Sequence, residues 1–156
     1  MLKSIRRALA GALEDPHAAS AHEHRQLQVA VAVLLHEARR ADYEEGGAES
    51  ALAERALVEL FGVDAAESAA LMKEGRAKAQ QQTSFYAPLA VIKREFSLDE
   101  RIRLVEHLWR ISFADGELSL YEDHYVRKMA HLLYVPNTQS MLARNRARSS
   151  GDARQA

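Results

Sequence analysis

Two short stretches of the sequence gather carboxylate side chains around a glycine-containing turn. The stretch RADYEEGGAES spans residues 40–50, and the stretch FADGELSLYED, residues 113–123, carries Asp115, Glu117, Glu122 and Asp123. Hard divalent cations prefer oxygen ligands, so carboxylates that converge on a tight turn favour such an ion. The adjacent His124 would add a nitrogen ligand, which favours zinc or manganese over calcium.

The same residues also fit a purely structural role at the ends of helices. Gly116 suits the left-handed conformation that often ends a helix. Ser119 and Glu122 form the S-x-x-E pattern of a capping box, which would direct Glu122 to backbone N–H groups. The spacing is not that of an EF-hand, because the glycine follows the first aspartate directly. A helix cap and a cation site are therefore both open alternatives here.

Composition excludes several other kinds of site. The 156 residues are 47% apolar, contain no cysteine and carry a net charge of −1. The absence of cysteine excludes thiolate zinc sites and cysteine nucleophiles, and the balanced charge argues against a nucleic-acid-binding protein. We expect a cytoplasmic protein without a transmembrane segment, because the longest apolar run, Val29 to Leu35, is far too short to cross a membrane.

No catalytic motif accompanies the acidic turns. The chain lacks a G-x-S-x-G nucleophile motif, a phosphate-binding loop and a dinucleotide fingerprint. HEARR, residues 36–40, lacks the second histidine of the zinc-protease motif H-E-x-x-H. We therefore expect a protein that is not an enzyme.

Helix-forming residues and 3.6-residue periodicity run through almost the whole chain. They predict an all-α bundle of about seven helices in a single domain, residues 1–148, followed by a disordered tail, residues 149–156. Asp64 and Ser97 are expected to cap helices, and Pro88 is expected in a first turn. The apolar spacing predicts one buried face through Leu27, Val31, Leu34, Ala38 and Ala41, and a second through Ile102, Val105, Trp109 and Ser112. The expected helices are about 2–13, 20–41, 48–61, 64–81, 83–96, 98–113, 119–134 and a short one after Pro136.

A weak internal repeat links the two acidic turns. A shift of 73 positions lays residues 34–45 over residues 107–118, so that Ala41-Asp42 matches Ala114-Asp115. Past the turn, a shift of 72 lays residues 54–63 over residues 126–135. The pattern predicts two related helical hairpins, about 27–63 and about 100–135, each with an acidic turn.

Four segments carry a resemblance to a known family: LVEHLWRISFADGELSLYEDHYVRKMAHLLYV, LLHEARRAD, ERALVELFGVD and FSLDERIRLVEHLW. Over about residues 27–147, the chain resembles the TerB-like (tellurite-resistance protein B) family. The resemblance implies an all-helical, duplicated domain whose acidic turns bind divalent cations. It also implies a link to tellurite resistance and the stress response. A related domain occurs in a membrane-anchored DnaJ-like co-chaperone.

The resemblance implies a set of metal-binding residues in each turn. The second turn matches the family at Gly116 and at the acids Asp115, Glu117 and Glu122. The first turn matches less well, because Tyr43 replaces the glycine and extra residues precede the helix; its implied ligands are Asp42, Glu44 and either Glu54 or Glu49, of which Glu54 is preferred. The ion could be Ca²⁺, Mg²⁺, Mn²⁺ or Zn²⁺.

Three functions remain open from the sequence. The first, which we favour, is a TerB-like module that binds a divalent cation and presents a helical surface to a protein partner. The second is a metal-independent interaction domain similar to that of the co-chaperone, whose acidic turns would meet basic patches. The third is a hydrolase that uses metal-bound water, which would need an open coordination position and a pocket. Assembly into a homo-oligomer is compatible with each.

Overall fold

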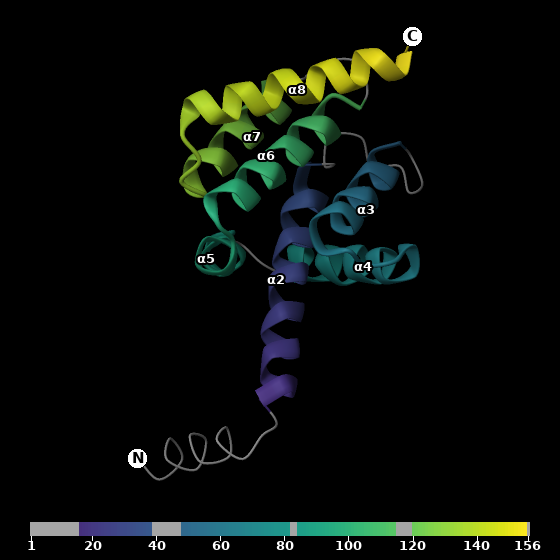
Figure 1. Cartoon of the computed structure of the whole chain (residues 1–156), viewed down its shortest axis with the longest axis vertical. Coiled ribbons are helices and arrows are strands. Elements are labelled where there is room, and N and C mark those ends of the chain that lie inside the picture. The colour runs from purple at the N-terminus through teal and green to yellow at the C-terminus, as the bar shows by residue number, and fades with distance from the viewer. Residues whose placement is uncertain (1–15, 39–47, 82–83, 115–119, 156) are drawn as a thin grey trace.

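A computed structural model of the chain describes residues 16–38, 48–81, 84–114 and 120–155 (Figure 1). These residues form seven helices and no strand, which confirms the predicted all-α bundle. The expected helix 2–13 and both acidic turns between helices, residues 39–47 and 115–119, lie outside the described part. The helices are α2 (Pro16–Ala38), α3 (Ala48–Phe61), α4 (Ala65–Gln81), α5 (Tyr86–Glu95), α6 (Leu98–Ser112), α7 (Leu120–Leu132) and α8 (Asn137–Gln155).

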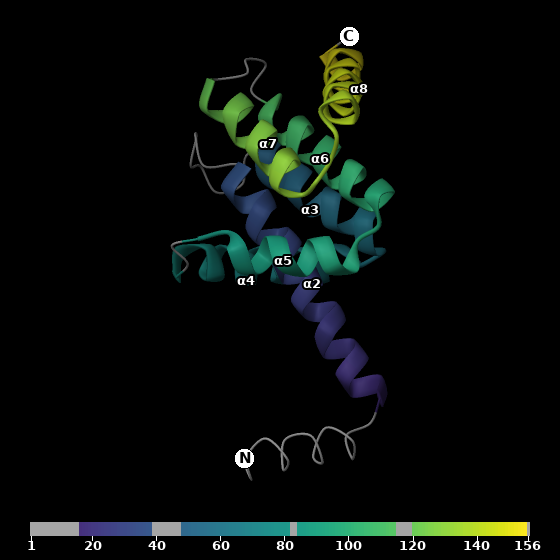
Figure 2. The same cartoon turned by 90° about the vertical axis from the view of Figure 1, so that its left-hand side faces the viewer.

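Helix α2 is the central element of the bundle. Its residues from Leu27 to Leu35 are all buried, including Gln28, so this stretch has no solvent-exposed side. The sequence pattern predicted a single buried face through Leu27, Val31 and Leu34, but the buried surface of α2 extends all around the helix in this stretch. The uninterrupted apolar run Val29–Leu35 places apolar side chains all around the helix, which is typical of a fully enclosed helix. The first turns of α2 project beyond the other helices (Figures 1 and 2).

Helices α4 and α5 lie across α2 (Figure 2). The contact with α4 is close because Gly75 has no side chain: a Cβ built there would lie 2.6 Å from Ala32 Cβ and 2.8 Å from the Ala32 carbonyl carbon. At the same interface, the Arg25 guanidinium pairs with the carboxylates of Glu67 and Glu74, the latter at 2.8 Å. A small-residue contact at one point and an ion pair at another thus set the crossing of α2 and α4.

Helices α3, α6, α7 and α8 lie above α4 and α5 in Figures 1 and 2 and complete the core, where α6 contacts α2, α3, α7 and α8. Helix α6 is buried on two sides. Leu104, Leu108 and Ile111 lie on one side, and Val105 and Trp109 lie on the other, which is the face that the spacing predicts. Trp109 is fully buried, and its indole Nε1 donates a hydrogen bond of 3.4 Å to Ser140 Oγ on α8. Helix α6 therefore joins α8 to the rest of the bundle.

Local signals in the sequence set most helix boundaries. The Asp64 carboxylate accepts a hydrogen bond from the Glu67 backbone N–H at 2.8 Å, as expected for the start of α4. Ser97 and Glu100 form the predicted capping box of α6, and Pro88 lies in the first turn of α5. Gly62, with a φ of 68°, takes the left-handed conformation just after α3.

Three boundaries differ from the sequence-based expectation by more than two residues. Helix α5 begins at Tyr86 rather than near residue 83. Helix α2 begins at Pro16 rather than near residue 20, because proline is well tolerated in a first helical turn. Helix α8 runs to Gln155, so helix covers most of the stretch 149–156 that we expected to be disordered. The hydroxyls of Ser149 and Ser150 donate to the carbonyls of Asn145 and Arg146, which lets both serines lie within the helix.

The two hairpins of the predicted repeat correspond to α2–α3 and α6–α7. The members of each hairpin contact one another, and α3 also packs against α6. This arrangement joins the two pairs in one core. Their origin by duplication stays a prediction.

Adding a methyl group at Gly75 tests the contact between α2 and α4. Gly75→Ala should lower the free energy of unfolding by about 1 to 3 kcal/mol, because the new Cβ overlaps the rigid backbone of α2 and outweighs the better helix propensity of alanine. Urea unfolding of the two proteins measures the difference. Ala77→Gly, at an exposed position of α4, gives the propensity effect alone. Unchanged or increased stability of Gly75→Ala would contradict the close contact.

Candidate functional site

Glu122, the predicted metal ligand for which the structure gives the clearest placement, lies in the first turn of α7 and is only 5% exposed. A carboxylate removed from water to this degree requires hydrogen-bond donors, a basic group or a cation around it, and Glu122 does form a polar interaction within the chain. Asp115 and Glu117, the ligands predicted beside it, lie outside the described residues, as do Asp42 and Glu44. The clustering of these five acids therefore stays a prediction.

The rotation of α7 about its axis is fixed by Tyr125. This side chain is buried, and its hydroxyl donates a hydrogen bond of 2.8 Å to the Leu34 carbonyl of α2. Burial raises the pKa of the Tyr125 hydroxyl well above its ordinary value, so the group stays a neutral donor. Val126 and Met129 are buried on the same side of α7. Glu122 lies on this inward side as a consequence.

The same rotation turns His124 outward. Residues two positions apart lie on nearly opposite sides of a helix, and His124 is exposed whereas Glu122 is buried. The imidazole of His124 therefore cannot complete a site around Glu122. The nitrogen ligand that the sequence suggested is lost, and the donors that remain are carboxylates.

Asp123 already has basic partners. Its Oδ2 accepts a hydrogen bond of 2.7 Å from Arg127 Nε, and its Oδ1 lies 3.9 Å from Arg144 Nε on α8. Two arginines thus neutralise one of the four acids of the stretch 113–123 without a cation. The sequence shows Asp123 as part of the acidic stretch, but it does not predict the contact with Arg144, because that residue lies on a different helix.

Arg144 also covers the end of α6. Its guanidinium carbon lies 5.6 Å from the ring centroids of both Trp109 and Phe113, and these two rings stack on each other. Cation–π contacts of this kind are worth about 0.5 to 2 kcal/mol. Phe113 is the C-terminal cap residue of α6, so Arg144 ties α8 to the point where the acidic turn begins.

The remaining predicted ligand, Glu54, is half-buried on α3. It lies six residues after the first residue of α3, about 9 Å along the helix axis. This distance separates Glu54 from the first acidic turn by more than one helical turn. Glu49, which the resemblance offers in its place, lies in the first turn of α3.

A network of charged and polar side chains joins α3, α6 and α8. No motif in the sequence predicts it. Glu59 of α3 accepts a hydrogen bond of 3.4 Å from Arg110, and a carboxylate oxygen of Glu59 lies 3.3 Å from His107 Nε2. Arg110 also binds Glu106 at 2.7 Å, and Glu106 pairs in turn with Arg146 of α8. All five groups have partners within the bundle, so the network serves packing of the helices.

His107 is the buried member of this network. Burial lowers the pKa of the His107 imidazole from 6.5 to about 4, and the nearby Arg110 adds to this effect. The carboxylates of Glu59 and Glu106 act in the opposite direction but do not compensate the loss of hydration. The imidazole is therefore neutral at physiological pH, with an N–H that can donate to Glu59.

A hollow of about 190 Å³ lies over α2, between the end of α4 and the start of α5. Its walls are mainly apolar, and Lys78 is the one charged residue among them. General acid–base or nucleophilic catalysis needs groups positioned together, and this hollow does not bring such a set together. It is lined by Gln26, Val29, Ala30, Val33, Lys78, Ala87, Pro88 and Val91.

Within the described ranges, no three histidine, aspartate or glutamate side chains are arranged to hold a metal ion. The described helices also include none that is both long and apolar enough to cross a lipid bilayer. The fold thus defines an all-helical domain whose buried Glu122 adjoins an acidic turn.

The family model described as tellurite resistance protein TerB matches residues 28–145 of the chain. This range covers all of α3 to α7, about the second half of α2 and about the first half of α8. The chain belongs to the TerB family. No curated protein and no solved structure gives a significant match.

Acidification should destabilise the protein through His107. Because its pKa is lower in the folded than in the unfolded state, the stability that it contributes is complete above pH 6.5 and is lost as the pH falls toward 4. The loss should approach about 1.4 kcal/mol per pH unit within this window. Urea unfolding at several pH values measures the slope.

His107→Gln keeps an N–H donor beside Glu59 but does not titrate, so its slope in this window should be shallower than that of the parent. His131→Gln, at an exposed position of α7, should leave the slope unchanged. Equal slopes for the parent and His107→Gln would show that His107 is not the group responsible.

Proposed function

We propose that the chain is a non-enzymatic binding module that holds a divalent cation at the turn between α6 and α7, with Asp115, Glu117 and Glu122 as ligands. The observation that carries the proposal is the burial of the Glu122 carboxylate immediately after an acidic turn. Membership of the TerB family supports it. The link to tellurite resistance and the stress response rests on that membership.

The chemistry of the donor set fits a hard cation. With His124 turned outward, the proposed ligands are carboxylate oxygens, which suit Ca²⁺, Mg²⁺ or Mn²⁺ better than Zn²⁺. A cation would neutralise acids that otherwise repel one another at a tight turn. The second set, Asp42, Glu44 and Glu54, is proposed as a weaker site, because Glu54 lies farther along its helix than Glu122 does.

A metal-independent interaction domain is the second candidate function. It is favoured by the pairing of Asp123 with Arg127 and Arg144, which shows that protein side chains supply positive charge next to the turn. In that case Glu122 would serve as the capping-box partner of Ser119. The two candidates predict opposite responses to cations.

Thermal melts after chelation, and then with added Ca²⁺, Mg²⁺, Mn²⁺ or Zn²⁺, separate the candidates. A cation that binds only the folded state adds about 2.7 kcal/mol at a hundredfold excess over its Kd. For a domain of this size, that gain raises Tm by roughly 5 to 10 °C. Asp115→Asn combined with Glu122→Gln should abolish the response.

Glu100→Gln is the matched control for the double variant. It removes a carboxylate from the first turn of α6 but keeps an oxygen that accepts the Ser97 N–H, so it should change stability little and respond to the cation like the parent. If no cation moves the Tm of the parent, or if the double variant responds equally, the turn is a helix cap.

A further inference from the structure

The outward side of α7 carries aromatic and basic residues, and the acid at its border, Asp123, is paired with Arg127 and Arg144. Its exposed positions recur at intervals of three or four residues, so they share about one third of the helix circumference. Tyr121, at one end, is 50% exposed. We call these residues the α7 face: Tyr121, His124, Arg127, Lys128 and His131, together with Tyr134 just beyond the helix.

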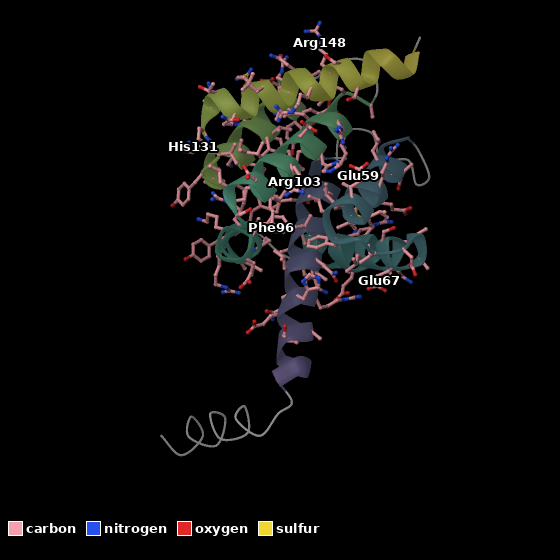
Figure 3. All side chains as sticks on the ribbon, in the orientation of Figure 1. Glu59, Glu67, Phe96, Arg103, His131 and Arg148 are labelled. Carbon is pink, nitrogen blue, oxygen red and sulfur yellow. The ribbon has the colours of Figure 1, made fainter. Side chains whose placement is uncertain are left out.

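Figure 3 places His131 at the outer edge of the molecule, consistent with an α7 face that no described helix covers. Within the described chain, Lys128 forms no ion pair, whereas Arg127 pairs with Asp123. The face extends about 20 Å from Tyr121 to Tyr134, and among the described residues no carboxylate pairs with Lys128, so this positive charge stays unbalanced.

Tyr134 occupies a conformation that its side chain disfavours. Its φ is 56°, and the Val135 and Tyr134 N–H groups donate to the carbonyls of Ala130 and His131 in the pattern that usually places glycine at this position. A non-glycine residue in the left-handed region costs about 1 kcal/mol or more. Burial of the side chain does not offset this cost, because Tyr134 is 71% exposed.

Lys93 of α5 extends the α7 face. Its Nζ lies 4.6 Å from the centroid of the Tyr134 ring, so a second positive charge is held at this end of the face. Figures 1 and 2 place α5 below the end of α7. An exposed aromatic ring with a cation beside it, at a position better suited to glycine, points to a role in binding rather than in folding.

We propose that the α7 face docks an acidic segment of a partner protein, with Tyr121 and Tyr134 as anchors and Lys128 and Lys93 as the charges that pair with its carboxylates. Tyrosine is enriched at protein interfaces, where its ring buries a large area while its hydroxyl stays hydrated. This inference does not depend on the cation site, because Glu122 lies on the inward side of the same helix.

A protein partner fits the α7 face better than a nucleic acid or a membrane. Binding to a phosphate backbone relies on many basic contacts, and the chain as a whole carries a net charge of −1. A membrane-surface helix inserts a broad apolar face, whereas the apolar side of α7 is buried in the bundle. Charge complementarity therefore selects an acidic polypeptide.

NMR titration of the labelled full chain with a short synthetic peptide of alternating glutamate and leucine tests the proposal. The amide signals of residues 121–134 and of Lys93 should shift most, and added salt should weaken the effect. A peptide with lysine in place of each glutamate should give no comparable shifts. Lys128→Glu should weaken binding of the acidic peptide at least about tenfold, whereas Lys73→Glu, on α4, should not.

Tyr134→Gly separates binding from folding. Glycine relieves the left-handed strain, so this variant should unfold at the same or a higher temperature than the parent, yet bind the acidic peptide at least about tenfold more weakly. Shifts spread over all basic residues, or equal binding of the lysine peptide, would overturn the proposal. So would larger α7 shifts with an oligonucleotide or anionic vesicles, or a self-association that Lys128→Glu abolishes.

Discussion

The structure depends on the enclosure of α2. Residues Leu27–Leu35 are buried all around the helix, and each such leucine or valine contributes about 1.5 to 3 kcal/mol when it leaves water. A helix with no polar side needs neighbours in every direction, so α3, α4, α5, α6 and α7 all contact it. Gly75 allows α4 to approach closely enough to cover Ala32, and a larger residue would open that side of the core.

The position of the candidate site follows from this enclosure. Tyr125 donates to the Leu34 carbonyl of α2, which fixes the rotation of α7 and so decides which side chains face inward. Glu122 becomes a buried carboxylate, while His124 and Lys128 face solvent. One helix can therefore present two chemistries: an inward acid beside the turn after α6, and an outward aromatic and basic face.

The sequence predicted those parts of the fold that depend on local chemistry. The caps at Asp64 and Ser97 predicted the starts of α4 and α6, and the apolar spacing predicted the burial of Trp109. The contacts of Arg144 with Asp123 and with Trp109 could not be predicted, because they join segments far apart in the chain. The burial of His107 depends on α3 for the same reason, and periodicity alone does not show which helices meet.

The candidate site was predictable in residue type but not in geometry. Acidic residues at a turn indicated a cation, yet only the rotation of α7 separates Glu122 from His124. The most direct measurement of the central claim is an anomalous difference map from crystals soaked in Mn²⁺. We expect a peak at about 2.0 to 2.6 Å from a Glu122 carboxylate oxygen. A map without a peak there, at full Mn²⁺ saturation, would contradict the cation site at the α6–α7 turn.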